Sequence, residues 1–251
     1  MPSGKIDDLA AFDAEYIAGR SWLVGIDEAG RGALAGPVCA GAAAVSAKLY
    51  ASRRHVEFLA GLDDSKKLSE AAREDVYKRL EELKNAGFID FEAAFASVEE
   101  IERDNILAAT QLAMSRACAA VNERLGLGLR RAGTVATLFG ESSVDSSLAE
   151  VLIDGKPMKK FAYMHRAIVK GDASSLAVAA ASIVAKVSRD RLMRGLAAKY
   201  PRFGFDLNKG YGTAAHLQAL MLFGAQPVHR PSFLKKLRGE SMRGDSQREL
   251  W

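Results

Sequence analysis

In the 251-residue chain, four carboxylic acids each stand at or just past the end of a short apolar stretch. They are Asp27, Glu28, Asp154 and Asp172. Strand ends are where open α/β sheets bind ligands, and acids that meet there repel one another unless a cation compensates. Hard cations such as Mg²⁺ prefer oxygen ligands, and two of them can serve both oxygens of a phosphodiester displacement. The pattern therefore suits a divalent-metal site that could act on a phosphodiester.

Each acid also has a structural interpretation. Asp154 precedes a glycine, which is a common turn pair. Asp172 could cap a helix that begins near Ser174. Asp27 and Glu28 are harder to explain in this way, because two adjacent acids after a buried strand are costly unless they are paired. From the residues alone, both interpretations stay open.

The elements that must position these acids alternate between strands and helices. Short apolar stretches predict strands at 22–26, 38–45, 88–95, 151–153 and 167–169. Helical spacing and capping residues predict helices at 70–85, 98–125, 174–200 and 213–223. Because three of the strands precede helices, we expect an α/β fold around a mixed sheet.

Three segments fall outside this alternation. Residues 1–20 have mixed charge and no clear period, and we expect them to form a leader. Residues 126–150 are rich in glycine, serine and threonine and are interpreted as a variable insertion. Residues 235–251 are polar and charged, which predicts a flexible tail.

The composition and the cysteine and histidine positions indicate a protein with a large core and no zinc site. The hydrophobic content of 49% is enough for a large core, and the net charge of +4 suits a polyanionic partner without requiring one. Cys39 and Cys118 lie in no Cys/His cluster, so we expect no zinc site and two buried thiols. His216 and His229 lack metal-ligand spacing and are interpreted as structural.

The chain shows no secretory or membrane segment. Acids interrupt the first fifteen residues, where a signal peptide needs an apolar run. The most apolar later stretch, 173–187, contains serines and is shorter than the roughly 20 residues of a membrane span. We therefore expect a cytoplasmic protein with no membrane partner.

Several blocks of residues together resemble the bacterial ribonuclease HII family. They occur in the family's order and extend over about residues 21–234. The blocks are 24–32 (VGIDEAGRG) with 34–38 (LAGPV), 64–68 (DSKKL), 153–155 (IDG), 170–172 (KGD) with 180–187 (AASIVAKV) and Arg189-Asp190, and 210–213 (GYGT) with His216, His229-Arg230 and Ser232-Phe233. Position 33 is an alanine where the family commonly has proline, a change that we expect to leave the chemistry intact.

The resemblance implies a fold, a reaction and a cofactor. It implies an RNase H-like fold in a catalytic domain over 21–234 that includes a helical C-terminal part. It implies a monomeric, Mg²⁺- or Mn²⁺-dependent endonuclease that cuts RNA/DNA hybrids, or the linkage 5′ of a single ribonucleotide in duplex DNA. The products are a 3′-hydroxyl and a 5′-phosphate. Asp27, Glu28, Asp154 and Asp172 become the metal-binding catalytic acids.

The resemblance also implies contacts to the nucleic acid. Gly30, Arg31 and Gly32 become the segment that senses the 2′-hydroxyl at the RNA–DNA junction, because glycines let the backbone approach the minor groove. Tyr211 becomes the ring that packs on the junction nucleotide. Further phosphate contacts are expected from Ser65, Lys66, Lys67, Asn105 and Lys186. Outside this context, a lone Gly-Arg-Gly is typical of a solvated turn and an isolated tyrosine is typical of the core or the surface. Residues 65–67 are typical of a solvated charged loop.

Two alternatives to this assignment stay open. The sister class, ribonuclease HIII, typically has an extra N-terminal domain and a glutamate as its fourth acid, whereas here about twenty residues precede the first block and the fourth acid is Asp172. A non-catalytic hybrid-binding module would not need all four acids. The final residues, 247–251, resemble a peptide that binds a sliding clamp, or they form an ordinary frayed terminus.

Overall fold

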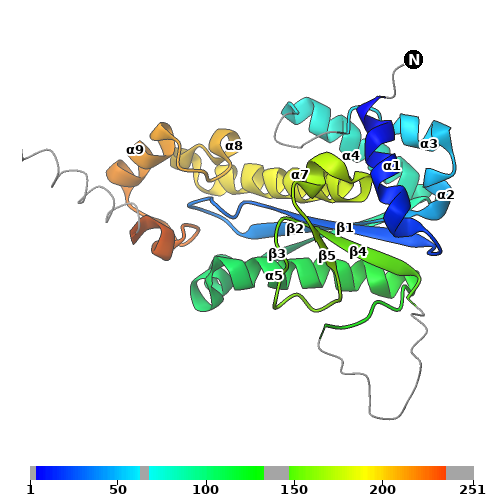
Figure 1. Ribbon diagram of the computed structural model, residues 1–251. Helices are drawn as coiled ribbons and strands as arrows, with labels where there is room; N and C mark the ends of the chain where they lie inside the picture. Colours follow the sequence, from blue (N-terminus) through cyan, green and yellow to red (C-terminus); the bar gives the residue numbers. More distant parts are fainter. Residues whose placement is uncertain (1–3, 63–67, 133–146, 236–251) are drawn as a thin grey trace, which may run out of the picture.

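The computed structural model describes residues 4–62, 68–132 and 147–235, and its centre is one five-stranded sheet (Figure 1). The strand order is β3-β2-β1-β4-β5. Strands β1, β2 and β3 pair antiparallel, while β4 is parallel to both β1 and β5. The mixed sheet and all five predicted strands are thereby confirmed. Their bounds are β1 Trp22–Ala29, β2 Val38–Ser46, β3 Ile89–Ala96, β4 Ala149–Asp154 and β5 Arg166–Ile168.

The four predicted helices are also confirmed, as α4 (Glu70–Asn85), α5 (Val98–Leu125), α7 (Leu176–Lys199) and α9 (Ala214–Phe223). Helix α7 begins later than expected, because Ser175 caps it by accepting a hydrogen bond from the Val178 amide. The remaining helices were not predicted. They are α1 Lys5–Ile17, α2 Ala47–Tyr50, α3 Arg53–Phe58, α6 Gly171–Ser174, α8 Phe205–Asn208 and the 3₁₀ helix η1 Pro201–Phe203.

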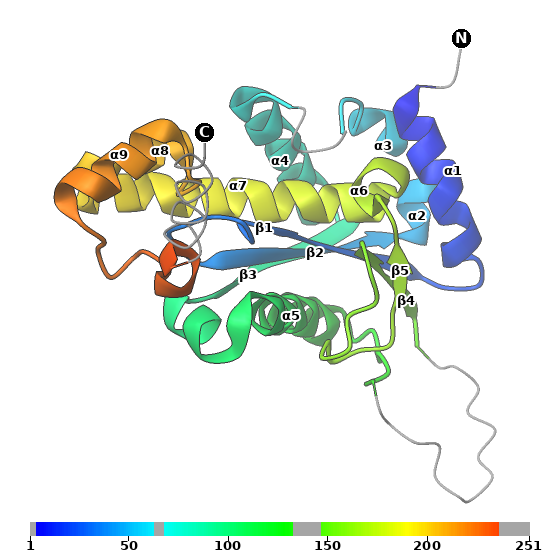
Figure 2. The same cartoon turned by 60° about the vertical axis from the view of Figure 1, so that its left-hand side comes forward.

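Helices cover both faces of the sheet. Helix α7 crosses one face together with α1 and α4, and α5 covers the other (Figures 1 and 2). The α7 contact is close, because a Cβ on Gly25 of β1 would lie 2.1 Å from the backbone carbon of Ala177, and one on Gly41 of β2 would lie 2.2 Å from the carbonyl oxygen of Ala181. The alanine-rich sequence of α7 thus lets its backbone lie directly against the strands, and this fixes α7 beside the end of β1.

Helix α1 falls in the segment expected to be a leader, yet it packs on the core. Its residues Ile6, Leu9 and Ile17 are buried. Its buried Asp13 accepts hydrogen bonds from the Tyr50 hydroxyl at 2.7 Å and from the Ala177 amide at 3.0 Å. Burial raises the pKa of Asp13 to about 6. Helix α1 is therefore tied to the first turn of α7.

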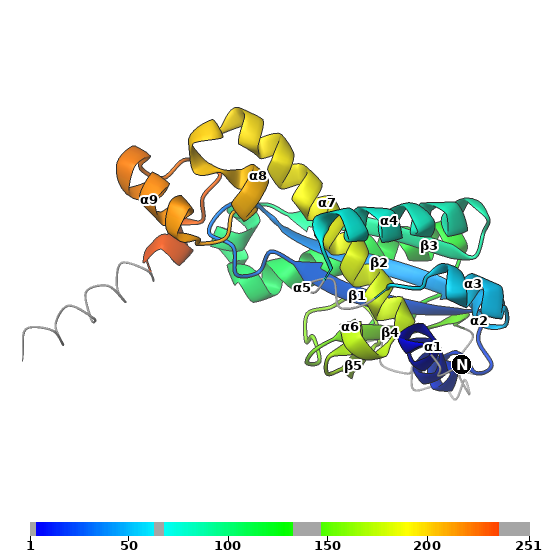
Figure 3. The same cartoon turned by 90° about the horizontal axis from the view of Figure 1, so that it is seen from above.

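The helical C-terminal part forms a smaller layer beyond one end of the sheet (Figure 3). Its own core includes Ala35, Met193, Phe203, Phe205 and Ala219. No helix in the described part of the chain is both long and apolar enough to cross a membrane. Both cysteines are buried, as predicted.

Candidate active site

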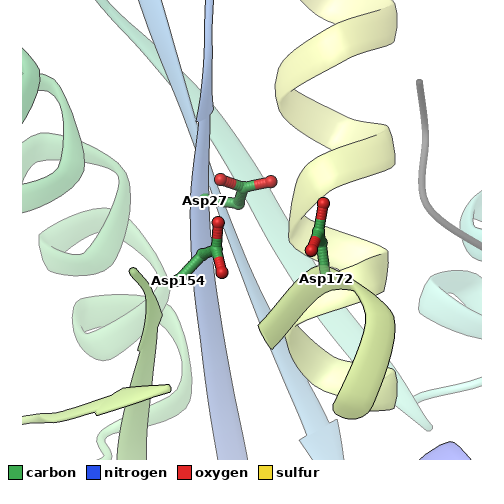
Figure 4. Close-up of side chains that lie close together, drawn as sticks. All are labelled: Asp27, Asp154 and Asp172. Atoms are coloured by element: carbon green, nitrogen blue, oxygen red, sulfur yellow. The ribbon is translucent and has the colours of Figure 1, made fainter. Parts of the chain in front are cut away.

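Three of the four predicted acids meet at one edge of the sheet, as Figure 4 shows. The parallel register pairs Ile26 with Ile153, so the next residues of the two strands, Asp27 and Asp154, lie side by side. Asp172 comes from the short helix α6, which is held close because the Gly171 amide donates to Asp154 Oδ1 at 2.6 Å. One carboxylate oxygen from each acid lies within 4.8 Å of those of the other two.

The electrostatics of this group favour a bound cation. Asp27 and Asp172 are buried, with exposed fractions of 4% and 6%. Burial raises the pKa of Asp27 well above its ordinary value, and the negative charges of Glu28 and Asp154 raise it further. Neither the Ser182 side chain nor the Glu28 amide, which both donate to Asp27, outweighs these effects. Three carboxylate oxygens that lie close together and whose negative charges repel one another suit a hard divalent ion.

The fourth predicted acid, Glu28, lies next to the group and is not part of it. Neighbouring residues of a strand point to opposite faces, so Glu28 turns away from Asp27. Its Oε1 accepts from Arg31 Nη1 at 2.8 Å. Glu28 still lines the groove beside the acids and acts on Asp27 through its charge. The structure therefore brings three predicted ligands together and holds the fourth in an ion pair at their margin.

A groove of about 570 Å³ opens over the acids and gathers most of the predicted contact residues. It is lined by Asp27, Glu28, Ala29, Gly30, Arg31, Gly32, Arg73, Asp154, Lys186 and Tyr211. Residues from β1, α7 and the loop before α9 thus form one surface, although up to 184 positions separate them in the sequence. We refer to the part formed by residues 30–32 and Tyr211 as the junction wall.

The groove also contains a cation that was not predicted from the sequence. Arg73 of α4 lines it, and Arg73 Nη2 lies 3.6 Å from Asp190 Oδ2. Lys186 Nζ is 2.7 Å from the other oxygen of the same buried carboxylate. Asp190 therefore holds two positive charges in the groove that also contains Asp27 and Asp154. No local pattern marks Arg73, because it stands among the other charged residues of α4.

Two buried arginines fix the junction wall, and neither was predicted to have a role there. Arg189 donates to the carbonyls of Pro37, Lys209 and Ala35 at 2.9–3.1 Å. Arg230 donates to those of Gly36 and Arg31. Both arginines are fully buried. Since guanidinium groups are planar donors with several N–H bonds, each can join separate loops of backbone.

Gly30 has to be a glycine for two reasons. Its φ is +89°, a region that side chains disfavour, and a Cβ there would lie 1.9 Å from Arg189 Nε. The turn that carries the predicted 2′-hydroxyl contact is therefore packed directly on Arg189.

A pair of buried histidines holds the Tyr211 side of the junction wall. His216 Nδ1 lies 2.9 Å from the Tyr211 carbonyl, and the two Nε2 atoms of His216 and His229 are 3.1 Å apart. The Gln226 amide donates to His229 Nδ1 at 2.9 Å. All three contacts are satisfied when both rings are neutral, with His229 donating to His216 and His216 to Tyr211. Burial lowers the pKa of His229 to about 4.

Four predicted contact residues are not among those described in this groove. Ser65, Lys66 and Lys67 lie outside the described residues. Asn105 stands at a kink in α5, with φ +68°, where its Oδ1 accepts from the Leu107 and Ala108 amides at 3.0 and 3.2 Å. It lines a second groove that adjoins the first at Glu28.

Comparison with known proteins decides the family. The family model described as Ribonuclease HII matches residues 24–236. The chain belongs to the ribonuclease HII family. Proteins named Ribonuclease HII are 44% identical over 211 residues in Sphingopyxis alaskensis and 42% identical over 223 residues in Rhizorhabdus wittichii. The two alignments cover 84% and 89% of this chain, and 88% and 92% of those relatives.

Solved structures confirm the fold. RNase HII in its complex with PCNA from Archaeoglobus fulgidus superposes with a TM-score of 0.57 at 22% identity, covering 85% of this chain and 94% of that one. Bst-RNase HIII in complex with Mn²⁺ gives the same TM-score at 17% identity, covering 89% of this chain and 67% of that one. The RNase H-like fold predicted from the resemblance is therefore confirmed.

Membership of the family settles the class of activity. The protein is a type 2 ribonuclease H, a hydrolase and endonuclease that acts on RNA/DNA hybrids and depends on a divalent metal. The assignment favours this class over the two alternatives, ribonuclease HIII and a non-catalytic hybrid-binding module. The acid group adds a site of the required chemistry.

Proposed function

We propose that this ribonuclease HII cuts the RNA strand of hybrids, and the linkage 5′ of a single ribonucleotide embedded in duplex DNA, by two-metal-ion hydrolysis. The products are a 3′-hydroxyl and a 5′-phosphate. The observation that carries the proposal is the group of three carboxylates, two of them buried, with oxygens within 4.8 Å of one another. Such a group repels itself unless divalent cations neutralise it.

Asp27, Asp154 and Asp172 are the residues that would hold the metal, with Glu28 completing the set from its ion pair with Arg31. Divalent ions bound there would supply water activation for in-line attack and stabilisation of the leaving 3′-oxygen. Mg²⁺ and Mn²⁺ both suit carboxylate ligands. The chain's own contribution is to orient the Asp27 carboxylate through hydrogen bonds from the Ser182 side chain and the Glu28 amide, while its charge is left for a cation to stabilise.

The junction wall supplies selectivity in this proposal. The backbone of Gly30, Arg31 and Gly32 would contact the 2′-hydroxyl, since the two glycines carry no side chain and residues 31 and 32 are exposed. Tyr211, which is 36% exposed, would pack on the sugar or base at the junction. Lys186 and Arg73, both paired with Asp190, would contact a phosphate beside the acids. Ser65, Lys66, Lys67 and Asn105 stay predicted phosphate contacts.

A duplex of DNA with one internal ribonucleotide tests the proposal. We expect the protein to cut this duplex once with Mg²⁺ and to leave it intact with EDTA. End-labelled products should carry a 3′-hydroxyl on the upstream fragment and a 5′-phosphate on the downstream one. Cleavage that continues in EDTA, or a cut on the 3′ side of the ribonucleotide, would contradict the proposed mechanism. Parallel titrations with Mg²⁺ and Mn²⁺ identify the preferred ion.

The assignment carries several further expectations. We propose a monomer that works in the cytoplasm, with a catalytic domain over 21–234 between the 1–20 segment and the 235–251 tail. The solved relative from Archaeoglobus fulgidus is a complex with PCNA, and residues 247–251 of this chain resemble a clamp-binding peptide. Deleting residues 247–251 should abolish binding to a bacterial sliding clamp. No binding by the intact chain would end that idea.

A further inference from the structure

A second groove, of about 730 Å³, continues from the first on the other side of the acids. The two grooves share Glu28, Arg31 and Asp154. One wall of the second groove is the loop that follows β4, and the opposite wall is α5 around its kink. Asp154 and Glu28 thus stand where the two grooves adjoin. We call the second one the β4–α5 groove, and it is lined by Glu28, Arg31, Asn105, Leu107, Ala108, Gln111 and residues 154–160.

The loop wall of the β4–α5 groove is strongly basic. Lys156, Lys159 and Lys160 lie within five residues, and all three are exposed. None of them forms an ion pair with another part of the chain that the structure describes. Besides the hydrogen bond from Arg103, the charge of Lys160 lies near enough to Asp104 to lower the pKa of that carboxyl. The three neighbouring cations still repel one another, and a polyanion that enters the groove would relieve that repulsion.

The lysines project from a backbone that is held in place. Met158 and Phe161 of the same loop are buried in the core below α5. The Met158 amide donates to His165 Nε2 at 3.0 Å, and the Lys160 amide donates to Gln111 Oε1 at 2.5 Å. A loop that is anchored at both of these points holds the backbone that carries the lysines in place, so little backbone entropy is lost when they bind a ligand.

The α5 wall offers a neutral donor to the same ligand. The Oδ1 of Asn105 accepts from two backbone amides, and the exposed Asn105 side chain forms no further hydrogen bond with the residues that the structure describes. Its Nδ2 is therefore available as a donor. Leu107, which is 46% exposed, stands next to it. An amide donor and three ammonium groups across one groove match the oxygens of a sugar–phosphate backbone.

We infer that the β4–α5 groove binds backbone phosphates of the duplex on one flank of the linkage that is cut. The inference rests on the proposed function, because the acids set the position of that linkage. A strand whose linkage lies at the acids must continue past them, and the β4–α5 groove is a continuous basic path away from them. Lys156, Lys159, Lys160 and Asn105 are the residues that bind it.

A charge-matched pair of variants tests the groove. The first is Lys156→Gln/Lys159→Gln/Lys160→Gln. The control is Lys48→Gln/Lys78→Gln/Lys199→Gln, which removes the same charge from exposed lysines outside both grooves. Binding of a fluorescent RNA/DNA hybrid is measured by anisotropy in EDTA across a range of salt, so that it does not depend on cleavage.

We expect the groove variant to bind the hybrid on the order of tenfold more weakly at low salt. Its plot of log Kd against log salt should be less steep by about 0.9 for each phosphate that the variant no longer neutralises. The control should stay close to the wild type in both respects. Equal weakening in the two variants would mean that net charge alone is responsible and would overturn the inference. Thermal unfolding midpoints close to that of the wild type check that both variants fold.

Duplexes shortened on one flank at a time show where the path runs. With a single ribonucleotide at a fixed position, the weakening caused by the groove variant should vanish when one flank is shortened and persist when the other is. Weakening that is independent of both flank lengths would also overturn the inference. Failure of the wild type to cut any of these duplexes contradicts the proposed function instead, since the binding results do not require cutting.

Discussion

The acid group and the junction wall face each other across one groove, yet they treat buried charge in opposite ways. Asp27 is buried beside two other negative groups, and its environment disfavours its charge. Arg189 is buried more completely, but three backbone carbonyls accept hydrogen bonds from it. The buried charge of Arg189, which joins the loops of the junction wall, is thus stabilised by hydrogen bonds. The buried charge of Asp27 is left to be neutralised by a bound metal ion. Removing the two charges should therefore change stability in opposite directions.

The largest expected effect is that of Asp27→Asn. Loss of a metal-binding carboxylate should lower the rate of cutting by about a thousandfold or more, since a bound metal supplies several kcal/mol of transition-state stabilisation. In EDTA the same variant should unfold at a higher temperature than the wild type, because a repelled buried charge is gone.

Asp90→Asn is the matched control, because Asp90 is also buried but pairs with Arg124 and Lys84 away from the grooves. It should keep turnover and unfold at a lower temperature. Gel-based cleavage and thermal unfolding supply both readouts. Full turnover by the Asp27 variant would remove Asp27 from the site.

Arg189→Met should have the next largest effect, on stability. It leaves three carbonyls without their donor and should lower the free energy of unfolding by about 3 kcal/mol. Arg191→Met is the control, since Arg191 is 42% exposed and pairs with Glu74 at 2.6 Å, and it should cost less than about 1 kcal/mol. Urea unfolding measures both values. Equal losses would mean that the buried arginine does not brace the junction wall.

The histidine pair should make the junction wall sensitive to acid. The pKa of His229 is about 4 in the folded protein and about 6.5 when unfolded, so between these values the unfolded chain binds more protons. Stability therefore falls as the pH falls, by about 2 kcal/mol at a pH of about 5.

The change is measured as the unfolding free energy of the wild type minus that of the variant His229→Gln. The glutamine side chain cannot be protonated, and it can still donate to His216. Asp13 titrates in the same range with the opposite sign, and its contribution cancels in this difference. A difference in unfolding free energy that stays constant from neutral pH to a pH of about 5 would contradict the assignment of neutral rings.

The smallest effect is expected at Tyr211. Tyr211→Ala should reduce cutting at a single ribonucleotide about tenfold, which is the usual value of one stacked base or sugar. Tyr211→Phe keeps the ring and should stay close to the wild type. Initial rates on a single-ribonucleotide duplex and on a long hybrid separate selectivity from general binding. Equal reductions on both substrates would take Tyr211 out of junction recognition.

Much of the fold follows from local pattern. The five strands and the helices α4, α5, α7 and α9 were predictable, because apolar stretches, caps and helical spacing are properties of neighbouring residues. Helix α1 was not. Its buried face consists of Ile6, Leu9, Asp13 and Ile17, and the acid in that row hides the period. An acid can be buried there only because Tyr50 and Ala177 donate to it from elsewhere in the chain.

The sequence by itself determined which residues could do the chemistry. Asp27, Asp154 and Asp172 stand at strand ends or just beyond them, and the order of the blocks indicates the family. Only the tertiary structure decided that the carboxylates of Asp27, Asp154 and Asp172 lie close together, while Glu28 forms an ion pair with Arg31. It also decided that Arg73, Arg189, Arg230 and two histidines support the groove. Such interactions join residues far apart in the chain, and their geometry depends on how α7 and the C-terminal helices pack, which no local pattern specifies.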